Sequence, residues 1–255
     1  MSGDFYIGYQ KKAPAEIASF VRQTVVGVVV LSLAIGALLV TAQRPFANSV
    51  FEFGTTRTFE GVISDRPYPA LLVARPGQTE SGENVSRFSL VAPGKHGAGD
   101  VIAEHAGKRV RLDGTLVYRD SQTMIEIVEG SLHVLAVGDL SSAQPLSLGE
   151  FTLVGEIVDS KCYLGVMKPG NLKPHRACAV RCISGGIPPV FLVRGQDGSA
   201  QYLMLTGADG ETINNEVLDM VAENIEITGV VEHQDGQLSL RADPGTFRRL
   251  TETMR

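Results

Sequence analysis

The chain has 255 residues, a net charge of −5 and a sequence pI of about 5.6. That length leaves room for a membrane segment and about two small domains. The acidic balance and an aromatic content of 6% argue against a nucleic-acid-binding surface, which needs basic patches and stacking side chains. The 28 glycines and the lack of tryptophan favour short strands joined by turns over a helical bundle.

The first predicted element is a transmembrane helix over residues 23–43. This run carries no charge and is long enough to cross a hydrocarbon core of about 30 Å. Basic residues lie mainly before it, so the positive-inside rule predicts that residues 1–22 are cytoplasmic and the remainder is periplasmic, as in a single-pass protein of the bacterial inner membrane. A cleaved signal peptide is the alternative, because Val40-Thr-Ala42 offers small residues for cleavage.

The rest of the chain contains an internal repeat. Residues 58–65 match residues 152–159, with a glycine, an isoleucine and an aspartate at equivalent places, and residues 110–116 match residues 225–231. The repeated aspartates, Asp65 and Asp159, end predicted strands, and we interpret them as turn residues. The sequence therefore predicts two copies of one β unit.

Each copy alternates apolar and polar residues and is punctuated by turn signals, which is typical of strands with one buried face. Gly114 and Gly229 interrupt strands at equivalent places, where small barrels turn a corner. We expect a mainly β protein with two OB-like barrels, and a two-sheet sandwich is the alternative. The predicted bounds are 50–137 for the first unit, 138–148 for a linker and 149–247 for the second unit.

The second unit is about 21 residues longer than the first, and all three cysteines fall in this insertion, residues 161–189. Pro174 and the pair Gly185-Gly186 predict a helix over 174–184. His175, Cys178 and Cys182 then lie three and four residues apart on one face. Cys162 and Met167 precede this helix across a Lys-Pro-Gly turn.

Thiolate, thioether and imidazole groups are soft ligands, so we expect a metal site formed by Cys162, Met167, His175, Cys178 and Cys182. Copper is the first choice. Non-covalent haem with Met167 and His175 as axial ligands is a second cofactor hypothesis.

Cys178-x₃-Cys182 with a nearby histidine resembles the copper sites of cytochrome oxidase subunit II and of its copper chaperones, in ligand types only. It departs from the oxidase pattern because no histidine and methionine follow Cys182 closely. One helix followed by an OB-like periplasmic domain also resembles the haem chaperone of cytochrome c maturation, although the His-x₃-Tyr motif is missing. These resemblances imply metal or haem handling at a membrane.

Two other uses of the cysteines stay open at this point. In an oxidising compartment cysteines usually pair, and a disulfide from Cys162 to Cys178 or Cys182 would clasp the insertion and leave one thiol over. Thiol–disulfide redox chemistry is the other.

We expect an accessory subunit of a respiratory or other redox membrane complex, which uses the cysteine segment for electron transfer or metal handling and contacts other subunits. The alternative is a structural or assembly subunit without a cofactor. No hydrolase motif is present in the sequence, so the chain is not expected to be an enzyme by itself.

Overall fold

The computed structural model describes residues 12–42, 49–75, 85–140, 142–195 and 199–250. Its contacts divide the chain into two units, Met1–Phe46 and Ala47–Arg255, each described here by itself. The first contains helix α1 (Ala15–Ala42), none of whose residues is buried and whose mean hydropathy reaches 2.7. The helix is long and apolar enough to be a membrane span or a signal sequence. Helix α1 begins eight residues before the predicted span of residues 23–43 and ends one residue before its end.

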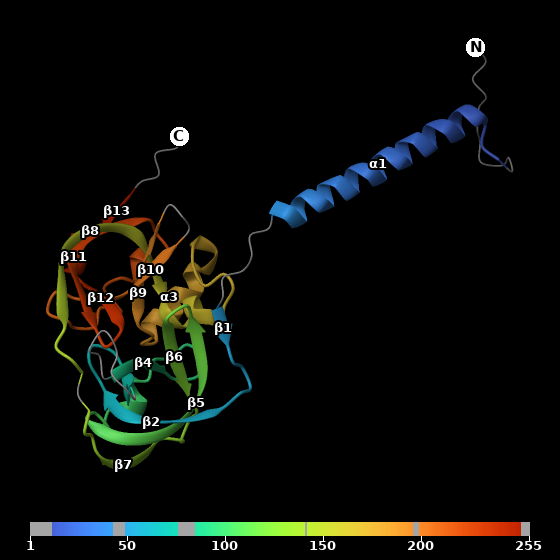
Figure 1. Ribbon diagram of the computed structural model, residues 1–255. Coiled ribbons are helices and arrows are strands. Elements are labelled where there is room, and N and C mark those ends of the chain that lie inside the picture. Colours follow the sequence, from blue (N-terminus) through green and yellow to red (C-terminus); the bar gives the residue numbers. More distant parts are fainter. Residues whose placement is uncertain (1–11, 43–48, 76–84, 141, 196–198, 251–255) are drawn as a thin grey trace. The chain divides into compact units, whose positions relative to one another are not determined.

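The second unit begins with a closed five-stranded barrel (Figure 1). Its strands follow the order β5-β2-β3-β4-β6 and close through β5 and β6, with β4 and β6 parallel and the other pairs antiparallel. Strands β1 and β7 pair with β5 outside the barrel. The elements are β1 (Ser49–Phe51), β2 (Arg57–Ser64), β3 (Ala70–Ala74), β4 (Val85–Val91), α2 (Gly99–Ile102), β5 (Lys108–Arg119), β6 (Gln122–Ile127) and β7 (His133–Val137).

A second barrel repeats the same connectivity, with strand order β11-β8-β9-β10-β12 and a parallel β10–β12 pair. Its strands are β8 (Leu146–Asp159), β9 (Pro189–Arg194), β10 (Ala200–Thr206), β11 (Ile225–Gln234), β12 (Gln237–Arg241) and β13 (Arg248–Arg249). Its helical segments are η1 (Cys162–Val166), η2 (Lys173–His175), α3 (Arg176–Ser184), η3 (Leu218–Met220) and η4 (Pro244–Thr246).

The predicted mainly β fold with two small OB-like barrels is therefore confirmed, and the sandwich alternative is wrong. Strand β5 pairs with β2 up to Gly114 and with β6 from Gly114 onward, so the barrel turns its corner at this glycine. A Cβ atom on Gly114 would lie 2.3 Å from Ile125 Cγ2, and one on Gly229 would lie 2.4 Å from the Arg241 carbonyl oxygen. Both glycines are required because the closing strand passes too near for a side chain.

Each barrel has its own apolar core, and a third apolar cluster joins the two barrels. This cluster combines residues of the first barrel, such as Val117 and Met124, with Leu192 and Met204 of the second. Cys162 and Cys182 are buried within it. The insertion is therefore part of the packing between the barrels and not a loose loop.

A buried ion pair also links the barrels. Arg87 on β4 and Asp235 in the β11–β12 turn have side chains only 6% and 2% exposed, with 3.8 Å between Arg87 Nε and Asp235 Oδ2. The Tyr68 hydroxyl of the first barrel donates to the Leu205 carbonyl of the second at 2.9 Å. Burial lowers the pKa of Arg87, and the Asp235 carboxylate opposes that shift.

Replacing Asp235 by Asn should lower the free energy of unfolding by about 3–5 kcal/mol, because it leaves the Arg87 guanidinium buried without a counter-charge. Denaturant unfolding of the detergent-solubilised full chain measures the loss. Asp219→Asn is the matched control, since Asp219 forms an exposed pair with Arg249. Equal effects of the two substitutions would contradict the importance of the buried pair.

Candidate metal centre

The insertion lies between the first and second strands of its barrel. Residues 160–188 connect β8 to β9, whereas residues 65–69 connect the equivalent strands β2 and β3. In OB-like barrels this connection is one of the loops that bind ligands. The cysteines therefore lie in a loop at which an OB-like barrel tolerates inserted residues and can bind ligands.

The three cysteines converge in the structure. The Sγ atoms of Cys162, Cys178 and Cys182 all lie within 4.8 Å of one another. Two sulfurs on opposite sides of one ion, each at about 2.3 Å, would be about 4.6 Å apart, so all three are within reach of a single thiophilic ion. Cys162 and Cys182 are buried and Cys178 is half-buried, which leaves one side of the sulfur group open to solvent.

A carboxylate–histidine pair adjoins the sulfur group. His175 Nε2 lies 2.9 Å from Asp159 Oδ2, and both side chains are almost fully buried. Asp159 also accepts the backbone N–H of Cys162 at 2.8 Å. Ligand atoms of Asp159, Cys162 and His175 lie within 4.8 Å of one another, so Cys162 belongs to both groups. A carboxylate that holds one ring nitrogen and fixes the orientation of the imidazole is common beside metal-binding histidines.

A lysine from the first barrel supplies positive charge. Lys95, between β4 and α2, has its Nζ 2.7 Å from Cys178 Sγ and 3.8 Å from Cys182 Sγ. The hydrogen bond to Cys178 raises the pKa of Lys95. The hydrogen bond from Cys162 lowers the pKa of Cys182, with a further contribution from Lys95, while the same bond and burial raise the pKa of Cys162. The sulfur group therefore holds one thiolate more readily than an isolated thiol would.

Lys161 fastens the Lys95 loop to the insertion. Its Nζ donates to the carbonyls of Ala92 and Gly94 at 2.9 and 2.8 Å and pairs with Glu126 at 2.5 Å. The Lys161 side chain is 2% exposed, so these three oxygens replace its hydration. Lys161 belongs to the second barrel, and its partners belong to the first. Because it binds the loop that also contains Lys95, it holds Lys95 beside Cys178.

The other end of the same loop contacts the end of α3. Gly97 N–H donates to the Gly185 carbonyl at 2.8 Å. A Cβ on Gly185 would lie 2.0 Å from the Lys95 carbonyl oxygen, and one on Gly97 would lie 2.2 Å from the Gly186 carbonyl oxygen. Gly185-Gly186 ends the helix as predicted, and in addition these glycines let the two barrels approach across the site.

The alternative disulfide from Cys162 does not form, because all three cysteines are free thiols in this structure. The predicted helix forms as η2 and α3, but His175 joins Asp159 and Cys162, while Cys178 and Cys182 join Cys162 in the sulfur group. Met167 is 45% exposed, whereas His175 is buried and bound to Asp159. The two side chains therefore differ in environment. The haem hypothesis and the assignment of Met167 as a ligand stay predictions.

The structure adds residues that sequence reasoning missed. Asp159 contributes more than turn chemistry, since its carboxylate both caps the Cys162 amide and binds His175. Its position three residues before Cys162 is the signal that could have revealed it. Lys95 and Lys161 gave no local signal, because their partners lie 35 or more positions away.

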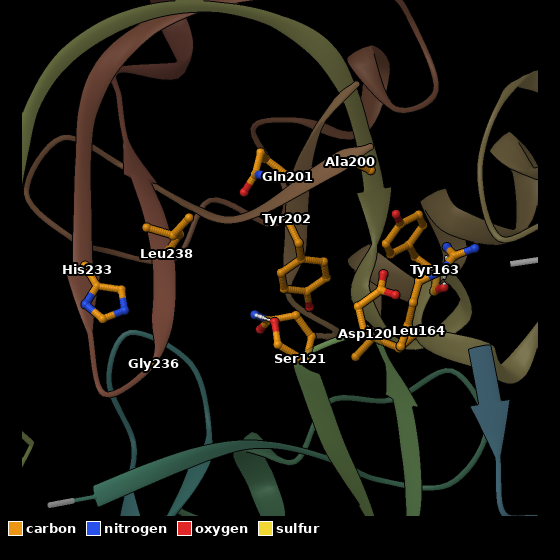
Figure 2. A pocket seen from close by; sticks show the side chains of 12 residues that line it. Asp120, Ser121, Tyr163, Leu164, Ala200, Gln201, Tyr202, His233, Gly236 and Leu238 are labelled. Atoms are coloured by element: carbon orange, nitrogen blue, oxygen red, sulfur yellow. Dashed lines mark hydrogen bonds between the residues drawn. The ribbon is translucent and has the colours of Figure 1, made fainter. Parts of the chain in front are cut away.

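A pocket of about 250 Å³ lies beside the insertion, between the β5–β6 turn and the second barrel. Figure 2 shows Tyr163 and Tyr202 on one side of it and His233 on the other. The two tyrosine rings stack at 6.1 Å between centroids, and the Arg119 guanidinium lies over Tyr163. Because Tyr163 directly follows Cys162, this pocket borders the cysteine segment.

Comparison of the chain with protein-family models, with curated proteins and with solved structures finds no significant match.

The thiols should titrate in separate steps. Cys182 should form a thiolate below the ordinary thiol pKa of about 8.5, and Cys162 only far above it. The ultraviolet absorbance of thiolate, followed against pH in the metal-free chain, measures this. Cys162→Ala should shift the early step upward by removing the donor to Cys182.

The stability of the folded state should depend on the ionisation of Cys182. A thiol whose pKa is lower in the folded chain than in the unfolded chain stabilises the fold when ionised, and that contribution is lost as the pH falls through the folded pKa. Three thiols that ionise together at the ordinary pKa would contradict the hydrogen bond between Cys162 and Cys182.

Proposed function

We propose that this chain is a membrane-anchored metal-binding protein whose cysteine site holds copper as Cu(I). The observation that carries the proposal is the convergence of three free thiol sulfurs within 4.8 Å. We expect this part of the chain to lie outside the cytoplasm, where cysteines usually form disulfides. Three neighbouring thiols that form no disulfide there are best explained by a bound ligand that keeps them reduced. A soft metal ion is such a ligand.

The donor set favours Cu(I) over harder ions. Sulfur ligands select Cu(I), zinc and iron–sulfur centres, and a three-sulfur group suits a low-coordinate Cu(I) ion without further ligands. Zn²⁺ would take a fourth ligand, for which His175 beside Cys162 is the candidate. Three thiolates and one Cu(I) ion carry a net negative charge, and the Lys95 ammonium would offset part of it.

We further propose that the protein serves as an accessory subunit of a respiratory or other redox complex of the bacterial inner membrane. The apolar helix α1 would anchor it, with the barrels on the periplasmic side. Exposed apolar side chains on the barrels support a protein partner, since such patches mark interaction sites. They include Val134, Leu135 and Val137 on β7 and Leu146, Leu148 and Phe151 on β8.

The metal test uses the full chain in detergent, reduced and loaded anaerobically with Cu(I) or Zn²⁺. We expect one ion per chain, measured by elemental analysis after gel filtration. Cys162→Ser, Cys178→Ser and Cys182→Ser should each weaken affinity more than tenfold, because each removes a ligand. His175→Ala should weaken Zn²⁺ more than Cu(I), while the exposed His133→Ala serves as the matched control. Unchanged affinity in all three serine variants would refute the site.

The anchor test separates a membrane span from a signal sequence. We expect the mature protein to keep residues 15–42 and to stay in the membrane fraction after an alkaline wash, because an apolar helix of this length partitions into lipid. Amino-terminal sequencing and fractionation measure this. A soluble mature chain that begins after Ala42 would show that the helix is a cleaved signal.

A further inference from the structure

The contact between Lys95 and Cys178 is unusually close for a hydrogen bond to sulfur. Their Nζ and Sγ atoms are 2.7 Å apart. That is at the short end of the range for N–H···O bonds, although a sulfur acceptor is larger than oxygen. One bridging oxygen atom spans a separation of this size between nitrogen and sulfur.

Both groups are held in place from opposite sides. The Lys95 loop is fixed by Lys161 and by the Gly97–Gly185 hydrogen bond, and Cys178 is fixed on α3. Cys178 is also the most accessible of the three thiols, since Cys162 and Cys182 are buried. An oxidant that arrives from solvent therefore meets Cys178 with the Lys95 amine beside it.

We propose that Lys95 and Cys178 form a covalent Nζ–O–Sγ bridge when the metal-free protein meets dioxygen. The Lys95 ammonium first releases one proton to solvent. One N–H bond of the resulting amine and the S–H bond of the thiol then break, and an N–O and an O–S bond form. Nitrogen and sulfur together give up four electrons to one dioxygen molecule. One of its oxygen atoms becomes the bridge, and the other leaves as water with the two released hydrogens.

The competing product for Cys178 is a disulfide. Cys182 lies one helical turn away, and residues so spaced on a regular helix have Cβ atoms about 5–6 Å apart, beyond the 3.5–4.5 Å of a disulfide. Cys162 is buried in the apolar cluster between the barrels. The amine of Lys95 is thus the partner that the fold presents to an oxidised Cys178.

The bridge gives the proposed metal site a redox control, and this part of the inference rests on the proposed function. A sulfur bonded to oxygen no longer serves as a thiolate ligand. Metal and bridge therefore compete for Cys178, and oxidation would close the site while it joins the two barrels covalently.

The experiment measures the intact mass of the full chain in detergent, purified anaerobically without metal and then exposed to air. We expect the gain of one oxygen atom with the loss of two hydrogens. Peptide mapping without reductant should join the peptide of Lys95 to that of Cys178, and a thiol reductant should separate them. Loading with Cu(I) before air exposure should prevent the change.

Matched variants identify the partners. Lys95→Arg keeps the positive charge on an exposed residue and should abolish the bridge, as should Cys178→Ser, whereas Cys182→Ser should retain it. Loss of two hydrogens alone, gain of oxygen with Lys95 unlinked, or an unchanged mass would each overturn the inference. Metal binding by the reduced chain is measured separately, so the bridge and the metal site can fail independently.

Discussion

The burial of one lysine ammonium governs the arrangement of the site. Lys161 leaves the end of β8 and places its charge among two loop carbonyls and the Glu126 carboxylate of the other barrel. A buried charge without such partners would cost several kcal/mol, so the barrels are held in the one arrangement that supplies them. The position of Lys95 over the cysteines follows, because Lys95 belongs to the loop that Lys161 binds.

The two barrels share one scaffold, and only the second carries the cysteine site. Both copies close through the same strand order and the same corner glycines, which reflect constraints of barrel packing. They differ at one connection, where the first copy has a short loop and the second has the cysteine insertion. Asp65 is exposed, while its counterpart Asp159 is fully buried and organises the site. The same residue at the same strand end thus lies on the surface in one copy and within the candidate metal centre in the other.

The site combines groups from both barrels in a partly closed environment. Two thiols and the Asp159–His175 pair are buried, so their hydrogen bonds act with little competition from water. Cys178 is half-buried and Lys95 is exposed, so this side of the sulfur group is the one open to solvent. The candidate metal centre therefore has a buried inner side and an accessible outer side.

Local sequence patterns determined the secondary structure and the two-barrel organisation of this protein. The uncharged run predicts α1, the alternation and repeated glycines predict two barrels, and Pro174 with Gly185-Gly186 predicts the helix that aligns His175, Cys178 and Cys182. Local periodicity carries this information because strands and helices place side chains at fixed spacings. Only the tertiary structure decided that the cysteines stay unpaired, that Asp159 holds His175, and that Lys95 and Lys161 cross between barrels. Those contacts join residues distant in sequence, and they depend on how two closed barrels pack together, which no local pattern encodes.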